Sequence, residues 1–419
     1  AAALVAEEFT LHQFGGNCAA VHWHESSVAA RTAVVNQARH QLLAGARFAG
    51  DMHWRLAARH ARDQRTKLLH RFGGAEQAPA AVAFPAAVGE LVKLCESFSI
   101  PVTIAMSNLY LNFPTDHPMH LGFDPMKYLA EADVVLVIEA DVPWFPIKGQ
   151  PKPGAKIIQM GIDPFFSRYP MRTFPADVPI STDPETGLRS LREVLATHRA
   201  EKRKTLQVRF DRLAKEHEAQ KAAWKATAEK YRKDRPIDMG WLSNCVGQVR
   251  DADTVIINEY DLQAQQVPMN ETGTFFGSPM SSGLGWCFGA ALGVKLARPE
   301  CVPIVCMGDG AYHFTAPTAC HFVAQNLPVV VVVFNNQCWN AVKGSVIDLY
   351  PQGWAVRKDH FVLCDLEPSP AYEKIAESFG GYGERVEDPG QIIPALRRAV
   401  QAVRKEKRQA LLNVICKHP

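Results

Sequence analysis

The segment Gly308-Asp309-Gly310 and the pair Asn335-Asn336 decide the fold, because a strongly apolar run precedes each of them. Residues 303–307 (PIVCM) lead into the first motif and residues 327–334 (LPVVVVVF) into the second. Such runs predict strands that are buried on both faces of a parallel sheet. Each motif then follows the carboxyl end of a strand, which is the edge where parallel α/β sheets bind ligands.

The side chains at this edge are suited to a divalent cation. Asp309 offers a carboxylate and Asn336 an amide oxygen, and both are hard ligands of the kind that Mg²⁺ or Ca²⁺ takes. A helix that begins after Gly310 would also point N–H groups at an anion. Ordinary tight turns contain the same glycine-aspartate-glycine triplet. The second strand, with its Asn pair, is what favours a binding site.

The combination resembles the signature of thiamine diphosphate (ThDP) enzymes of the acetolactate synthase and benzoylformate decarboxylase superfamily. The resemblance implies that Asp309, Asn336 and the main-chain carbonyl of Cys338 bind Mg²⁺, and that the Mg²⁺ holds the diphosphate. It also implies that the cofactor lies against the residues around the first motif, namely Gly308, Gly310, Ala311 and Tyr312.

A glycine-rich stretch upstream supports the same assignment. Residues 277–286 (GSPMSSGLGW) lead into a helix of small residues predicted over 287–297, and taken alone they are a loop that caps a helix. The resemblance implies that Leu284, followed by Gly285, supports the bent cofactor, and that the carbonyl of Ser282 accepts a hydrogen bond from the aminopyrimidine. Further upstream, a strand predicted over 254–258 runs into a loop where Asp261 and Leu262 are expected on the diphosphate side.

The whole chain is predicted to be α/β, with two doubly wound parallel-sheet domains. Residues 86–198 alternate helices with strands predicted over 100–105, 132–139 and 155–162, which favours a Rossmann-like central domain. Residues 199–235 predict a charged helical linker, and residues 236–419 the domain that binds the ThDP diphosphate and Mg²⁺. Residues 1–85 form an atypical, mostly helical N-terminal segment without an assignment. They hold eight Arg, one Lys and seven of the 15 His.

The central domain carries no clear nucleotide fingerprint. Some family members bind FAD there, but the Arg-Phe-Asp-Asp-Arg stretch expected of them is missing after the second strand. The sequence Ala140-Asp141-Val142-Pro143 stands there instead, so FAD is not expected. No GxGxxG segment is present, which argues against an NAD-dependent enzyme.

Composition excludes several other classes of function. A net charge of +3 gives no electrostatic case for nucleic acid or a membrane surface, and no apolar run approaches the roughly 20 residues that span a bilayer. Ten Cys without CxxC pairs indicate reduced thiols and a cytoplasmic location. His22-Trp23-His24-Glu25 could hold a metal, but a third ligand at a defined spacing is missing.

ThDP chemistry also needs a carboxylate that activates the pyrimidine ring. In the family it lies on a separate pyrimidine-binding domain, for which residues 1–85 are too few. Glu25 is a weak candidate, because a His-Glu pair before an Ala-rich stretch faintly echoes the family's glutamate region. The domain could come from a second polypeptide, be lost, or be replaced by the N-terminal segment. The chain is therefore expected to be a homo-oligomer or to associate with a chain that supplies this domain.

The sequence predicts ThDP-dependent decarboxylation of a 2-oxo acid followed by carboligation, by this chain as an enzyme or as one subunit of it. Residues 339–343 (WNAVK) lack the acidic residue with which some pyruvate decarboxylases protonate their product, and this favours ligation. Trp339 and Phe314 could shape a substrate pocket or simply pack. The alternative is a non-catalytic ThDP- or nucleotide-binding subunit, or an assembly subunit, that has lost the pyrimidine domain.

Overall fold

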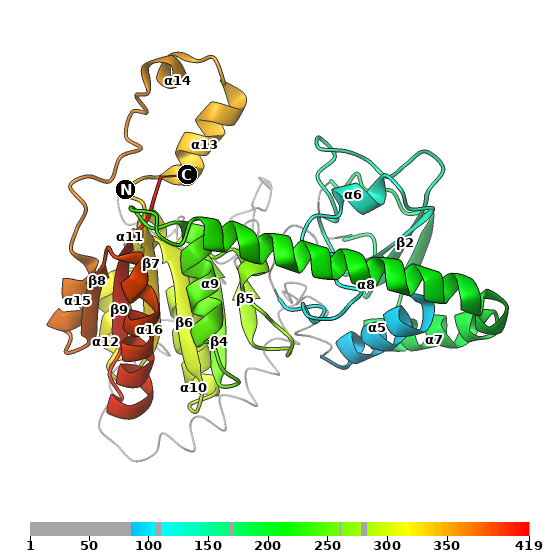
Figure 1. The fold of residues 1–419 in the computed structure, drawn as a ribbon, viewed down its shortest axis with the longest axis horizontal. Helices are drawn as coiled ribbons and strands as arrows, with labels where there is room; N and C mark the ends of the chain where they lie inside the picture. Colours follow the sequence, from blue (N-terminus) through cyan, green and yellow to red (C-terminus); the bar gives the residue numbers. More distant parts are fainter. Residues whose placement is uncertain are drawn as a thin grey trace, which may run out of the picture. The chain divides into compact units, whose positions relative to one another are not determined.

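The computed structural model describes residues 85–104, 110–167, 169, 171–259, 261–277 and 283–418. Glu25, with the rest of residues 1–84, and Ser282 lie outside this range. The described part contains a three-stranded and a six-stranded parallel sheet, and from β5 onward helices separate the successive strands of the larger sheet (Figure 1). The predicted α/β class is confirmed, whereas the predicted domain boundaries stay predictions.

The smaller sheet has the strand order β1-β2-β3. Two of its strands, β1 (Val134–Ile138) and β2 (Lys156–Gly161), lie where they were predicted, and β3 (Val178–Ser181) was missed because it is short and mostly exposed. The strand predicted over 100–105 is wrong. In its described part, 100–104, Val102 makes only an isolated bridge to His120. The helices of this region are α5 (Pro85–Phe98), α6 (Met126–Leu129) and α7 (Pro184–Ala196).

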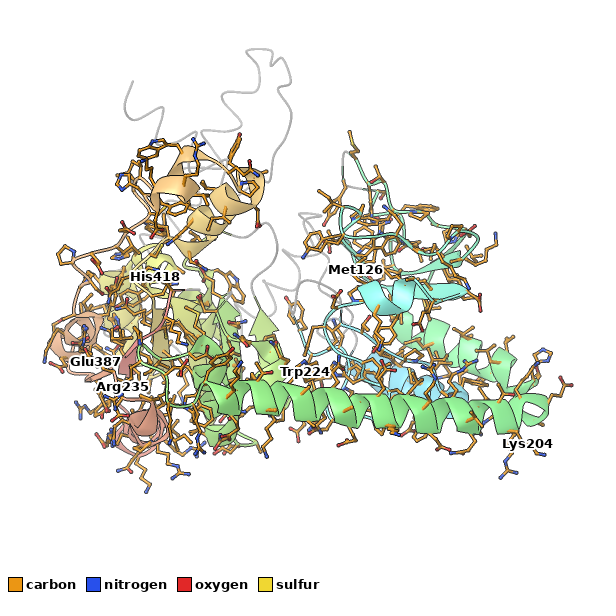
Figure 2. All side chains as sticks on the ribbon, turned by 45° about the horizontal axis from the view of Figure 1, so that its top comes forward. Met126, Lys204, Trp224, Arg235, Glu387 and His418 are labelled. Carbon is orange, nitrogen blue, oxygen red and sulfur yellow. The ribbon has the colours of Figure 1, made fainter. Side chains whose placement is uncertain are left out.

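A long polar helix, α8 (Arg199–Lys230), follows this sheet, as the charge pattern predicted. Its sparse apolar stripe, Leu206, Phe210 and Leu213, packs against the hydrophobic clusters of α5, α7 and the neighbouring loops. Figure 2 shows side chains projecting all around this helix, with Lys204 and Trp224 labelled. Most of the helix surface is therefore solvated, which fits a linker.

The larger sheet has the order β5-β4-β6-β7-β9-β8, with every neighbouring pair parallel. Its strands β4, β6 and β7 are buried along almost their whole length, and for β6 and β7 the apolar runs predicted this burial. The bounds are β4 (Thr254–Glu259), β5 (Phe275–Gly277), β6 (Val302–Gly308), β7 (Val330–Asn335), β8 (Tyr382–Val386) and β9 (Ala410–Ile415).

Helices cover both faces of the larger sheet, because successive side chains of a strand point to opposite faces. Ile256 and Ile304 pack with α9 and α16, whereas Val255 and Val305 pack with α10, α12 and α15. The bounds are α9 (Met239–Val249), α10 (Trp286–Ala297), α11 (Asp309–His313), α12 (Pro317–Ala324), α15 (Tyr372–Ser378) and α16 (Ile392–Gln401), with shorter turns η2 (Ala264–Gln266), η3 (Pro389–Gln391) and η4 (Ala402–Glu406).

Two further helices, α13 (Asn340–Leu349) and α14 (Trp354–Lys358), stand apart from the layers. They follow β7 and bury none of their own side chains, and Figure 1 draws them away from the sheet. Across the described residues, every helix is too short or too polar to cross a membrane.

Candidate cofactor and metal site

The larger sheet has a topological switch point between β4 and β6. The chain leaves β4 to form β5 on one side of it and then returns to form β6 on the other side. The register pairs Glu259 with Met307 and Gly308 with Phe334, so the carboxyl ends of β4, β6 and β7 are level. In open parallel sheets, ligands bind in the crevice at such a point. Both sequence motifs therefore lie at the edge where a ligand is expected.

The structure brings Asp309 and the loop of Asn336 together across this edge. Asp309 begins α11 directly after β6 and is 2% exposed. Its Oδ2 accepts a hydrogen bond from the N–H of Gln337 at 2.7 Å, and its Oδ1 accepts one from the N–H of Gly310 at 2.9 Å. The Oδ1 of Asn336 accepts from the N–H of Cys338 at 3.1 Å. The three predicted metal ligands thus belong to one hydrogen-bonded loop pair.

This set of oxygens fits a divalent cation. A carboxylate oxygen and an amide oxygen each have two lone pairs, so the hydrogen bonds to Gln337 and Cys338 leave capacity for a metal bond. Burial raises the pKa of Asp309 to about 6, against the opposing effect of the N–H groups of Gly310 and Gln337. A buried carboxylate is costly unless it is paired or coordinates a metal. A cation bound here would remove this cost.

The two glycines of the first motif are fixed by close approach. A Cβ on Gly308 would lie 2.9 Å from Oδ2 of Asp261, and one on Gly310 would lie 2.6 Å from the Trp339 ring. Contacts below 3.0 Å require a neighbour to move, so neither position accepts a side chain without a shift. The motif therefore keeps the end of β6 close to both neighbouring loops.

Glu259 connects β4 to the glycine-rich loop. Its carboxylate is fully buried and accepts from the N–H of Gly285 at 2.6 Å and of Cys287 at 3.0 Å, at the start of α10. Gly285 has φ +85°, and its Cα faces the carbonyl of Phe314. Leu284, predicted to support the cofactor, is left 43% exposed beside this loop. The loop is thus anchored to the same sheet edge as Asp309.

The other predicted cofactor residues are placed as follows. The carboxylate of Asp261 lies over Gly308, and its pKa is raised to about 7 by burial and by the charges of Asp309 and Glu259. Leu262 packs in the core, and its main chain exchanges two hydrogen bonds with the Asn258 side chain. Ala311 and Tyr312 are buried, and the Tyr312 hydroxyl bonds to His321. Cofactor contacts of these residues stay predictions.

Sequence reasoning missed the groups that support this edge from a distance. The role of Glu259 in capping α10 was missed, and so was Asn413, which bonds to Asn335 at 2.9 Å. The doublet Asn335-Asn336 carried a signal, since two adjacent polar residues after a buried strand need partners. Those partners follow only from the order of the strands.

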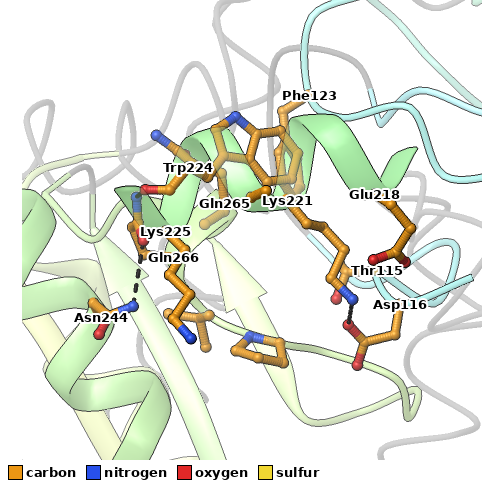
Figure 3. A pocket seen from close by; sticks show the side chains of 14 residues that line it. Thr115, Asp116, Phe123, Glu218, Lys221, Trp224, Lys225, Asn244, Gln265 and Gln266 are labelled. Carbon is orange, nitrogen blue, oxygen red and sulfur yellow. Dashed lines mark hydrogen bonds and ion pairs between the residues drawn. The ribbon is translucent and has the colours of Figure 1, made fainter. Parts of the chain in front are cut away.

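A separate cavity of about 350 Å³ lies beside α8 and shares no lining residue with the predicted cofactor site. Figure 3 shows Trp224 and Phe123 on one side and Lys221 pointing at Asp116, with Nζ and Oδ1 2.8 Å apart. It is lined by the loop that precedes α6, by α8 and by η2, and not by the carboxyl ends of β4, β6 and β7. The chemistry suggested by the motifs therefore does not belong to this cavity.

The sheet order and the switch point define an α/β protein whose two motifs lie at the carboxyl edge of the larger sheet, where the ligand is expected. Residues 259–414 match the family model described as "Thiamine pyrophosphate enzyme, C-terminal TPP binding domain". This range begins at Glu259 and includes every described residue of the predicted site. Over these residues the chain is similar to ThDP-dependent enzymes, and more distant relatives of the acetolactate synthase type extend the similarity to most of the chain.

Its relatives carry different activities. The chain is 27% identical to a sulfoacetaldehyde acetyltransferase of Alcaligenes xylosoxydans xylosoxydans, over 79% of this chain and 58% of that protein. It is 26% identical to a probable acetolactate synthase large subunit of Methanocaldococcus jannaschii, over 74% and 52%. The fold matches benzoylformate decarboxylase from Polynucleobacter necessarius with a TM-score of 0.61 and 18% identity, over 81% of this chain and 61% of the other. The chain thus spans little more than half the length of these curated relatives.

Proposed function

We propose that the chain is a ThDP- and Mg²⁺-dependent enzyme, or a subunit of one, that decarboxylates a 2-oxo acid and ligates the product to an acceptor. The observation that carries this proposal is the pairing of Asp309 with the Asn336 loop at the switch point of the larger sheet. When bound, ThDP would supply the electron sink for the electron pair that remains when CO₂ departs.

The chain's own residues would bind and orient the cofactor. Asp309, Asn336 and the carbonyl of Cys338 would hold Mg²⁺, and Mg²⁺ usually keeps substrate phosphate oxygens in its shell. The glycines at positions 308 and 310 would keep the end of β6 close to the two neighbouring loops, beside the residues that would hold the metal ion. Leu284 would support the cofactor from the glycine-rich loop, because it is a large apolar side chain left partly exposed beside the site.

Two observations favour transfer to an acceptor over simple release of an aldehyde. Residues 339–343 (WNAVK) contain no acidic side chain that could protonate a product. The relatives include proteins named as an acetyltransferase and an acetolactate synthase. The exposed ring of Phe314 lies 5.5 Å from the ring of Trp339, and the two could form one wall of the substrate site.

The activating carboxylate would come from a pyrimidine-binding domain on another subunit or chain. Glu25 remains a weak candidate and lies outside the described residues. We therefore expect a homo-oligomer or a complex with a chain that supplies this domain.

The direct test incubates the purified full chain with ThDP, Mg²⁺ and pyruvate, with and without a candidate partner chain. We expect CO₂ release together with an acetolactate-type product, and loss of both in the Asp309→Ala variant. Isothermal titration with ThDP and Mg²⁺ checks binding separately from turnover. Absence of any Mg²⁺-dependent ThDP binding would contradict the proposal.

One observation favours the alternative of a non-catalytic subunit. The carboxylate of Asp261 lies over Gly308, where it would repel a diphosphate unless a proton or a cation neutralises it. A subunit of this kind would bind ThDP weakly or bind it without turnover. Cofactor binding without CO₂ release, in the presence of every candidate partner, would support this alternative.

A further inference from the structure

A chain of buried hydrogen bonds lies behind the predicted metal loop and starts at Asn335, the last residue of β7. Asn335 is fully buried, and its Nδ2 donates to Oδ1 of Asn413 at 2.9 Å and to Oγ of Ser369 at 2.8 Å. Asn413 is also fully buried, and its Nδ2 donates to Oε2 of Glu373 at 2.8 Å. Glu373, in α15, is 7% exposed. This series of hydrogen bonds thus connects β7, β9, α15 and the loop before α15.

The other end of this hydrogen-bond network reaches residues 336–338, the loop that contains two of the predicted metal ligands. The Oδ1 of Asn335 accepts from the N–H of Gln337 at 3.2 Å, and the same N–H donates to Oδ2 of Asp309 at 2.7 Å. Gln337 has φ +60°, a left-handed conformation that is unfavourable for a non-glycine residue. Such a conformation persists only where the surrounding structure holds it. The bonds from Asn335 and Asp309 hold it between Asn336 and Cys338, which are two of the predicted ligands.

A contribution to folding stability does not by itself explain why buried polar residues occupy these positions. Asn413 is the one polar residue of β9, whose other residues are apolar and buried or nearly so. A set of buried polar groups replaced together by apolar groups of the same shape can be neutral for stability. Side chains that orient metal ligands, in contrast, typically change metal affinity by about 10- to 100-fold when they are mutated.

We propose that Asn413 and Glu373, acting through Asn335, are positioning residues that hold residues 336–338 in the conformation that binds the metal ion. This inference rests on the proposed function, since it assumes that the loop binds Mg²⁺ with ThDP. Ser369 belongs to the same device, because it takes the second N–H of the Asn335 amide. In the proposed site, Asn413, Glu373 and Ser369 contact neither the metal ion nor the cofactor.

Substitutions can separate positioning from stability. In Asn413→Asp the new carboxylate still accepts from Asn335 but faces the carboxylate of Glu373 without a proton to donate. Adding Glu373→Gln restores a donor toward position 413. Ser369→Ala removes one acceptor at a half-buried position, a milder change that keeps the fold. The matched control is Thr254→Val, which removes the hydrogen bond that the buried Thr254 hydroxyl donates to Asp251 at the opposite end of the sheet.

The measurement is the binding of Mn²⁺ to the full chain in excess ThDP, followed by the electron paramagnetic resonance of free Mn²⁺, with thermal unfolding recorded in parallel. We expect Asn413→Asp to weaken Mn²⁺ binding by about tenfold or more, Ser369→Ala to weaken it less, and Asn413→Asp/Glu373→Gln to recover most of the loss. Thr254→Val should lower the unfolding temperature and leave Mn²⁺ affinity unchanged.

Unchanged Mn²⁺ affinity in both Asn413→Asp and Ser369→Ala, with only the unfolding temperature lowered, would overturn the inference. A failure of the double variant to recover affinity would overturn the role of Glu373. A wild-type chain that binds no Mn²⁺ with ThDP would instead refute the proposed function, and this inference with it.

Discussion

In both sheets of this molecule, a glycine at the carboxyl end of one strand packs against a carboxylate from the neighbouring segment. In the smaller sheet Gly161 ends β2, and a Cβ there would lie 2.6 Å from Oε1 of Glu139, which follows β1. In the larger sheet Gly308 ends β6, and a Cβ there would lie 2.9 Å from Oδ2 of Asp261, which follows β4. In each sheet a glycine at the end of one strand makes room for a carboxylate that follows its neighbour.

What differs is what surrounds the carboxylate. Glu139 accepts from the N–H of Ile162 at 2.7 Å and lies at a half-buried edge of a sheet whose outer strand β3 is mostly exposed. Asp261 lies next to a second buried carboxylate, Asp309, and behind it lies the Asn336 loop. The comparison teaches that the glycine and carboxylate alone make a close-packed edge. Glu139 also has a second carboxylate nearby, Asp163, but that one is not fully buried and is bonded to Ser167. At the larger sheet the second carboxylate is buried and is joined to the amide loop, and this combination makes an edge suited to a cation.

The largest difference between the edges should follow the loss of Asp309. Asp309→Ala removes the predicted carboxylate ligand, so Mg²⁺-dependent ThDP binding should be abolished in a calorimetric titration. The matched change is Asp163→Ala at the smaller sheet, where the carboxylate accepts from the N–H and the hydroxyl of Ser167, both at 2.7 Å. That variant should bind ThDP like the wild type. Unchanged ThDP affinity in Asp309→Ala would remove the basis for treating the two edges as different.

The next effect concerns the two glycines. Gly161→Ala and Gly308→Ala each push a methyl group onto a carboxylate, and overpacking of this kind typically costs about 1–3 kcal/mol of stability. Both variants should show this loss in urea unfolding. Only Gly308→Ala should also weaken Mn²⁺ binding in the presence of ThDP, by about tenfold, because it displaces the end of β6 from which Asp309 starts. Equal Mn²⁺ affinities in the two variants would show that the close packing at Gly308 has no bearing on the metal.

Part of this comparison could be predicted from sequence. The motifs at 308–310 and 335–336 and the burial of β6 and β7 follow from local patterns, since apolar runs and turn residues act over a few positions. The strand predicted over 100–105 was wrong because an apolar run also fits a segment that packs as a loop. Strands β3 and β5 were missed because they are short and, for β3, mostly exposed.

The supporting groups could not be predicted in the same way. Glu259 reaches the N–H of Gly285 and Asn335 reaches Asn413 only because β4, β6, β7 and β9 adopt one particular order. The approach of Asp261 to Gly308 depends on the register of β4 against β6. The sequence therefore yields a prediction of which residues touch a ligand, whereas the residues that support them follow only from the packing of distant strands.

A smaller effect should appear in the pH dependence of stability without metal. Burial and the charge of Asp309 raise the pKa of Asp261 to about 7, well above the value of an unfolded chain. The stability that the neutral form contributes is therefore present at low pH and is lost as pH rises from about 4 to about 7. Asp261→Asn should be more stable than the wild type by about 2 kcal/mol at pH 8 in EDTA and should match it near pH 4. Urea midpoints at the two pH values check this, and a gap that is constant with pH would contradict it.

The smallest effect is expected at the corresponding carboxylate of the smaller sheet. Burial also raises the pKa of Glu139, but the N–H of Ile162 opposes the shift by bonding to the charged form. In Glu139→Gln the amide oxygen can still accept from Ile162, so urea unfolding at pH 8 should change by no more than about 0.5 kcal/mol, toward higher stability. Mn²⁺ and ThDP affinities should not change, because the predicted metal ligands lie at the larger sheet and Glu139 is not one of them. A loss of cofactor affinity in Glu139→Gln would mean that the carboxyl edge of the smaller sheet takes part in the site. Cofactor binding would then not distinguish the two sheets.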